Sequence, residues 1–188
     1  MGFPQLQNTL DVETYLAWED TQVEKHEYHR GEVFAMVGAR LPHQSVSGNV
    51  YSALKAALRG ALCRTYLDGT KLRIEADDAV LYPDALVTCD SRDRGAEDRF
   101  VSWPILVVEV LSESTAAYDR GAKFALYRQI ETLREYLVID PDTRRVEVFR
   151  RNAEDLWVLY DFTAAKEVEL SSLSVKLATE LIFEDIAD

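Results

Sequence analysis

Two acidic residues stand where this chain otherwise places apolar side chains. Glu109 interrupts the apolar run from Ile105 to Leu111, and Asp84 follows Tyr82 and Pro83 at the start of another apolar stretch. A buried carboxylate without a partner is unfavourable, so Glu109 must meet a cation, a hydrogen-bond network or solvent at a cleft. Because buried acids with perturbed pKa values cluster at functional sites, we interpret the pair as such a site.

The two carboxylates are suited to a hard divalent cation. Mg²⁺ or Mn²⁺ takes oxygen ligands, keeps several waters and leaves room for a phosphate. A zinc site is not expected, because His26, His29 and His43 are scattered and no His/Cys set has ligand spacing. The chain also lacks a Gly-rich phosphate loop, a dinucleotide fingerprint and a Gly-x-Ser-x-Gly elbow, which disfavours nucleotide-driven and serine-hydrolase chemistry.

A structural interpretation of the same residues stays open. Glu109 would then pair with Lys123 or Arg73, and Asp84 would be an acid in water at the start of a strand.

Periodicity predicts the elements that position these acids. A leading helix spans Val12 to Trp18, and a hairpin over Lys25 to Val37, broken at Gly31, carries Glu27 on its first strand. A helix from His43 to Leu62 turns apolar residues to the core and leaves a basic outer side with Lys55 and Arg59. Asp119 is placed to cap a later helix that ends at Ile130. The predicted strands are Lys71 to Glu75, Tyr82 to Cys89, Ile105 to Leu111, Glu135 to Asp140, Val146 to Phe149 and Leu156 to Tyr160. The tail from Val168 to Ile186 reads as a last strand and a short helix.

This alternation predicts an α/β (α+β) fold with a mixed central sheet flanked by helices, an N-terminal hairpin and a C-terminal β meander. The length of 188 residues and the absence of a linker favour one domain over residues 1–188. No apolar run approaches a membrane span, and Met1 to Leu10 does not resemble a leader, so no membrane partner is expected. Cys63 and Cys89 read as small reduced core residues, which implies a cytoplasmic location.

Charge gives mixed information about a nucleic-acid partner. The net charge of −12 is opposite in sign to what phosphate contacts favour. The distribution is uneven, because Ala39 to Arg73 contains a single acid, Asp68, against six basic residues: Arg40, Lys55, Arg59, Arg64, Lys71 and Arg73. An acidic cluster that binds a dication would also account for part of the negative excess.

Five stretches, in their order and spacing, resemble the Uma family of restriction endonuclease-like proteins. They are Glu27 to Gly31 (EYHRG), Tyr82 to Val87 (YPDALV), Val107 to Ser112 (VVEVLS), Asp119 to Arg128 (DRGAKFALYR) and Arg134 to Asp140 (REYLVID). The resemblance spans nearly the whole chain and implies the PD-(D/E)xK nuclease superfamily, whose αβββαβ core agrees with the order read from periodicity. It implies that Asp84 and Glu109 are the metal-binding acids, with the carbonyl of Val110 as a further ligand.

The chain departs from the superfamily pattern at the lysine. Leu111 stands two places after Glu109, where that lysine is expected. The resemblance implies that Lys123, on the following helix, takes its place, with Tyr127 one turn further on the same face. Lys123 could equally be a solvated helix residue.

The resemblance gives Glu27 a place in the metal shell or at a second ion, against the alternative of an exposed hairpin acid. Lys71 and Arg73 could approach a substrate phosphate or serve solubility. The activity implied is Mg²⁺- or Mn²⁺-dependent endonuclease cleavage of DNA, by a homodimer if both strands are cut. The alternatives are a non-catalytic nuclease fold used for binding or assembly, and a phosphodiesterase acting on RNA or small nucleotides.

Overall fold

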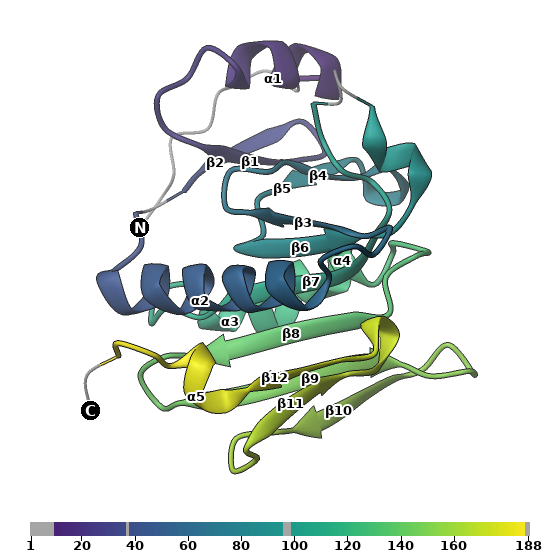
Figure 1. Cartoon of the computed structure of the whole chain (residues 1–188). Helices are drawn as coiled ribbons and strands as arrows, with labels where there is room; N and C mark the ends of the chain where they lie inside the picture. Colours follow the sequence, from purple (N-terminus) through teal and green to yellow (C-terminus); the bar gives the residue numbers. More distant parts are fainter. Residues whose placement is uncertain (1–9, 37, 96–98, 187–188) are drawn as a thin grey trace.

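A six-stranded mixed sheet forms the centre of the computed structural model, which describes residues 10–36, 38–95 and 99–186. Its strand order is β10-β9-β8-β7-β6-β3 (Figure 1). A four-stranded sheet of order β2-β1-β5-β4 and a two-stranded sheet of β11 and β12 complete the β structure of these residues. The predicted mixed sheet with flanking helices is confirmed.

The central strand is β7 (Pro104–Val110), paired antiparallel to β6 (Ala85–Thr88) and parallel to β8 (Glu135–Asp140). Because side chains alternate along a strand, Leu106, Val108 and Val110 face one side of the sheet and Val107 and Glu109 face the other. The prediction that Ile105 to Leu111 forms a buried central strand is therefore confirmed. Glu109 points toward the side that carries the third and fourth helices.

One face of this sheet is covered by α2 (Leu41–Ala57), α5 (Thr179–Ile182) and the pair β11 (Glu167–Leu170) and β12 (Val175–Ala178), which lie side by side in Figure 1. Pro42 occupies the first turn of α2, where its missing N–H costs no helical hydrogen bond. The helix ends before the predicted Leu62, because Leu58 caps it and Gly60 takes a left-handed conformation (φ 82°).

The other face is covered by a short helical segment and by the four-stranded sheet. The segment consists of α3 (Ala116–Tyr118), a π-helical turn over Asp119–Lys123, and α4 (Phe124–Tyr127). The sheet strands are β1 (His26–His29), β2 (Glu32–Ala35), β4 (Leu72–Ile74) and β5 (Ala79–Leu81). Beyond that sheet, α1 (Val12–Glu19) packs Tyr15 and Leu16 against Tyr28 and Val80.

The hairpin, the leading helix and the strand from Glu135 to Asp140 are confirmed, whereas two details differ from prediction and one is not tested. The predicted hairpin extends to Val37, which lies outside the described residues. The strand predicted at Lys71 to Glu75 belongs to the second sheet as β4, and the outer strand of the central sheet is β3 (Arg64–Leu67). Asp119 does not cap a helix, since the helical segment begins at Ala116 and Asp119 lies buried inside it.

The chain ends in a meander and a small β unit. The strands β9 (Arg145–Arg151) and β10 (Trp157–Asp161) extend the central sheet, as predicted for this region. The tail forms two strands and α5, one strand more than predicted, joined through a 3₁₀ turn at Ser171–Leu173. Two further 3₁₀ turns lie at Glu75–Asp77 and Ser91–Arg94.

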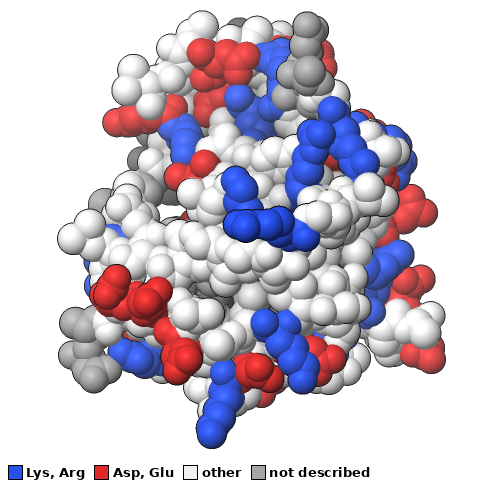
Figure 2. Space-filling model, viewed as in Figure 1, with Lys and Arg blue, Asp and Glu red and all other residues white. Residues whose placement is uncertain are grey.

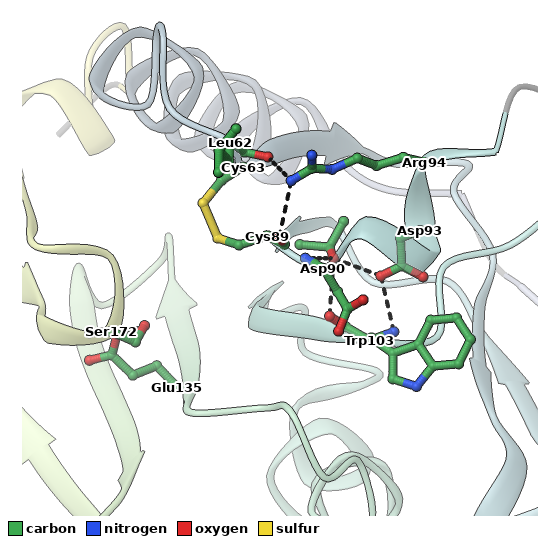
Figure 3. Close-up of a disulfide and its surroundings, with 10 residues drawn as sticks. Leu62, Cys63, Cys89, Asp90, Asp93, Arg94, Trp103, Glu135 and Ser172 are labelled. Atoms are coloured by element: carbon green, nitrogen blue, oxygen red, sulfur yellow. Dashed lines mark hydrogen bonds between the residues drawn. A yellow bond between two sulfur atoms is a disulfide. The ribbon is translucent and has the colours of Figure 1, made fainter.

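The prediction that Cys63 and Cys89 are reduced core residues is wrong, because they form a disulfide. The pairing of Arg64 with Thr88 in the ladder between β3 and β6 places the preceding and following residues, Cys63 and Cys89, opposite each other. Figure 3 shows Arg94 beside this bond, donating to the carbonyls of Leu62 and Cys89 at 2.6 and 3.1 Å. Both cysteines still pack against the core. The disulfide removes the reason for inferring a reducing compartment.

Within the described ranges, no helix combines the length and apolar character that crossing a membrane requires. The sequence-based expectation for Met1 to Leu10 falls, apart from Leu10, outside the described residues.

Candidate active site

Asp84 lies at the junction of β5 and β6, held by two donors from different elements. Its Oδ2 accepts a hydrogen bond from the backbone N–H of Val110 at 2.7 Å, at the end of β7. The same oxygen lies 3.3 Å from Nε2 of His43, in the first turn of α2. The Asp84 side chain is only 14% exposed, so the alternative of a solvated acid at a strand start is wrong.

His43 is a member of this site that the sequence did not reveal. Burial alone would lower its pKa, but the hydrogen bond and charge of Asp84 outweigh burial, and the pKa of His43 is raised from its ordinary value. Its position in the chain, far before Asp84 and with no ligand partner nearby, gave no signal of this contact. The imidazole therefore gains proton affinity from its place beside the Asp84 carboxylate.

Glu109 lies buried beneath the helical segment, with 3% of its surface exposed. Its Oε1 is 2.8 Å from Nζ of Lys123 and accepts a hydrogen bond from the hydroxyl of Tyr127 at 2.5 Å. Desolvation raises the pKa of Glu109 well above its usual value, Lys123 partly offsets this, and Asp84 and Asp119 raise the pKa further. The predicted structural pairing with Lys123 is present, and a pairing with Arg73 is not observed.

Lys123 stands at the centre of three carboxylates. Its Nζ lies 2.8 Å from Glu109, 3.0 Å from Glu27 and 3.8 Å from Asp119. Burial by itself would lower the pKa of Lys123, but the three acids raise it well above the ordinary value, so we assign the positive charge to this side chain. The alternative of a solvated helix lysine is wrong, because Lys123 is 5% exposed.

Glu27 reaches the same cluster from the second sheet. It is buried on β1, accepts from the backbone N–H of Tyr82 at 3.3 Å and lies 3.4 Å from the hydroxyl of Tyr118. The alternative of an exposed hairpin acid is therefore wrong. The hairpin, the central sheet and the helical segment all contribute to one site.

The site holds more acid than base. Its four carboxylates are Glu27, Asp84, Glu109 and Asp119, against the lysine and a histidine with raised pKa. Asp119 is also buried, and desolvation raises its pKa despite Lys123. Such an arrangement favours a proton or an added cation, since like charges in a buried cluster cannot all ionise freely.

The donor set fits a hard cation that keeps several of its own waters. Within the described residues, no three His, Cys, Asp or Glu side chains are arranged to hold a metal by themselves. Asp84 and Glu109 with a main-chain carbonyl, such as that of Val110, suit Mg²⁺ or Mn²⁺, which need only one or two carboxylates. The negative excess beside them makes such an ion favourable.

Three residues predicted to bind substrate have other contacts. Lys71 bonds Asp20 at 2.8 Å, and Arg73 bonds Asp78 at 2.8 Å and the carbonyl of Ala79 at 3.1 Å. The structure does not bring these two basic residues to the cluster. Tyr127 is fully buried and its hydroxyl is engaged by Glu109, so it is placed to position Glu109.

The mixed sheet, with acids at the adjoining ends of two strands and a lysine on the next helix, defines a restriction endonuclease-like fold. A solved structure described as a putative nuclease belonging to DUF820, from Anabaena variabilis, superposes with a TM-score of 0.75. The match covers 93% of this chain and 97% of that chain at 17% sequence identity. At that identity the likeness shows the fold alone.

Sequence comparison identifies the family within this class. Residues 12–181 match the model of the Uma2 family, described as "Putative restriction endonuclease", and the chain belongs to this family. The uncharacterized protein slr1290 of Synechocystis sp. is 36% identical over 95% of this chain and 93% of its own length. The uncharacterized protein sll1609 of the same organism is 29% identical over 88% of this chain and 95% of its own length. Membership of this family supports a nuclease-like function with a nucleic acid as substrate.

Proposed function

We propose that this protein is an Mg²⁺- or Mn²⁺-dependent endonuclease that hydrolyses phosphodiester bonds of DNA at the Asp84–Glu109 site. The observation that carries the proposal is the convergence of these acids with Lys123 in a buried, acid-rich cluster. We further propose a two-fold homodimer, since cutting both strands of a duplex calls for two symmetry-related sites.

The chain's own residues supply binding, orientation and charge. Asp84, Glu109 and the Val110 carbonyl would hold the divalent ion, whose chemistry there would be Lewis-acid polarisation of the phosphate and a lowered pKa of a bound water. The Val110 N–H and His43 hold Asp84 in one orientation, and Tyr127 does the same for Glu109. Lys123 offers a buried positive charge to the developing charge on the phosphate oxygens, where low polarity strengthens the attraction.

The test is metal-dependent cleavage of plasmid, linear duplex, single strands, RNA and cyclic nucleotides by the wild type and by Asp84→Asn and Glu109→Gln. Both variants should lose more than the roughly 10- to 100-fold that removal of an outer-shell partner costs. Asp155→Asn is the matched control, because Asp155 is exposed and has a left-handed backbone that Asn tolerates. Undiminished cleavage by Asp84→Asn would overturn the assignment.

The same panel separates the proposal from its rivals. Turnover of RNA or cyclic nucleotides, with none of DNA, would replace the endonuclease by a phosphodiesterase of other substrates. A non-catalytic scaffold would show no turnover and no Mg²⁺ or Mn²⁺ binding that depends on Asp84 and Glu109 in a calorimetric titration. Sedimentation of the wild type tests the homodimer independently of activity.

A further inference from the structure

The end of α2 opposite the active site carries a basic pocket that the proposed chemistry does not use. The pocket has a volume of about 690 Å³ and lies between the C-terminal half of α2 and β3. Its lining includes Tyr51, Lys55, Arg59, Cys63, Arg64 and Tyr66. We propose that this pocket holds the sugar–phosphate backbone of the DNA that is cut at the Asp84–Glu109 site.

The cations of this pocket have no acidic partner. In the described part of the chain, no carboxylate lies within 4 Å of Lys55, Arg59 or Arg64, whereas Lys71, Arg73 and most other basic side chains have one. The sequence from Val33 to Leu67 contains no Asp or Glu, although the whole chain has 33. In Figure 2, Lys and Arg side chains gather over the middle of the face shown, and Asp and Glu lie mainly toward its rim. The pocket is therefore a positively charged region, suited to an anion, on a protein whose net charge is negative.

Hydrogen bonds and a disulfide hold in place the elements that carry the basic side chains. Lys55 donates to the hydroxyl of Tyr51 at 2.7 Å, which leaves the hydroxyl hydrogen free to donate outward. The loop that follows α2 is tied to β6 by the Cys63–Cys89 disulfide and by Arg94, which bonds the carbonyls of Leu62 and Cys89. Because these contacts already hold the loop in place, less conformational entropy is lost when a ligand binds.

A solvent-facing side of α2 leads to the pocket. Residues 45, 48, 52, 55 and 59 recur at spacings of three and four, so they share one side of α2 and its extension. The first three are Ser45, Gly48 and Ser52, and a Cβ added at Gly48 would meet nothing within 4 Å. Small residues thus leave this side of α2 open up to Lys55, whereas His43, which contacts Asp84, projects from the opposite, core-facing side of the helix.

The distance between the active site and the pocket indicates the length of DNA that the protein would contact. Twelve helical residues from His43 to Lys55 span about 18 Å at 1.5 Å per residue. This length corresponds to about five base-pair steps of duplex DNA at 3.4 Å each. Because His43 and Lys55 also project from different sides of the helix, the pocket would contact phosphates at least about five nucleotides from the scissile bond, which fixes the position of the backbone without reading sequence.

The test is the salt dependence of DNA binding, measured by fluorescence anisotropy with a 20-base-pair duplex in EDTA, where metal-dependent cleavage does not occur. The variant Lys55→Gln/Arg59→Gln/Arg64→Gln should lose about three phosphate contacts, so the slope of log K against log[salt] should fall by about 2.7. At 50 mM salt the affinity should fall about a hundredfold or more. Thermal unfolding checks that the variant folds.

Arg145→Gln/Lys166→Gln/Lys176→Gln is the control, because it changes net charge equally and alters exposed residues outside the pocket. An equal loss of DNA affinity in this control, or an unchanged salt slope in the pocket variant, would overturn the proposal that the pocket binds DNA. The substrate's identity rests on the proposed function, but the outcomes separate. If the wild type binds DNA through the pocket but does not cut it, the pocket proposal stands and the endonuclease proposal fails. If the pocket variant binds and cuts DNA like the wild type, the endonuclease proposal stands and the pocket proposal fails.

Discussion

The two ends of α2 handle charge in opposite ways. At its N-terminus, His43 joins a buried cluster in which each of the four carboxyl groups lies within 4 Å of Lys123 or of His43 itself. At its C-terminus, Lys55, Arg59 and Arg64 are exposed and have no carboxylate partner among the described residues. Pairing in the interior protects stability, whereas unpaired charge at the surface costs little and remains available to a ligand.

The largest effect on stability should come from the centre of the buried cluster. Lys123→Met leaves Glu27, Glu109 and Asp119 without their shared cation, so we expect a loss of about 3–5 kcal/mol in the free energy of unfolding at pH 7 in EDTA. Because the pKa of folded Lys123 lies above its ordinary value of 10.5, its contribution is complete at pH 7 and is lost only as pH rises through the folded pKa. Urea unfolding measures the change.

The control for that change is Lys176→Met, which removes an exposed pair with Glu167 at 3.8 Å. Its loss should stay below about 1 kcal/mol. An equal loss in both variants would contradict the distinction between buried and exposed charge.

The disulfide should have the next largest effect. Cys63 and Cys89 are 26 residues apart, and closing a loop of that length in the unfolded chain stabilises the folded state by about 3.5 kcal/mol in the chain-entropy description. Cys63→Ser/Cys89→Ser should lose about 2–4 kcal/mol in the same unfolding experiment. A reducing agent should bring the wild type to the stability of the variant and leave the variant unchanged; a wild type insensitive to reduction would refute the expectation.

A smaller loss is expected when one donor of the buried cluster is removed. Tyr127→Phe takes the hydroxyl away from Glu109, and loss of this hydrogen bond should cost about 1–2 kcal/mol. If Tyr127 acts by positioning Glu109, the metal concentration at half-maximal cleavage should rise about 10- to 100-fold, while KM for DNA stays constant. A changed KM with an unchanged metal requirement would instead mean direct substrate contact.

The smallest effect on stability should be at the exposed end. Arg59→Gln removes no ion pair, so the free energy of unfolding should change by no more than about 0.5 kcal/mol. The salt slope of DNA binding should nevertheless fall by about 0.9. A loss of stability without a change in the salt slope would assign Arg59 a structural role. It would also contradict the proposed difference between the paired charges at the N-terminus of α2 and the unpaired charges at its C-terminus.

The sequence was informative where a residue conflicted with its surroundings. Glu109 inside an apolar strand was such a conflict, and the strand, its burial and the contact with Lys123 follow from it. His43 and Asp119 gave no comparable signal, because each meets its partners only through tertiary packing. The roles of Asp84, Glu109, Val110 and Lys123 in catalysis stay predictions.

Other differences from prediction have similar causes. Short strands such as β3 and β5 lack a long periodic pattern, so neither was predicted from the sequence. The disulfide could not be foreseen from two cysteines 26 residues apart, because only the antiparallel register of β3 and β6 brings them together.

The π-helical turn at Asp119–Lys123 has a consequence for how this site can change. A π turn accommodates one residue more than an α-helical turn, and each residue gained or lost rotates everything beyond it by about 100°. Deleting Gly121 would regularise the backbone, yet it would change the angle between Asp119 and Lys123, both of which now point inward. The inward direction of Lys123 therefore depends on the number of residues in this segment as much as on their identity. Insertions and deletions here should be tolerated less well than substitutions.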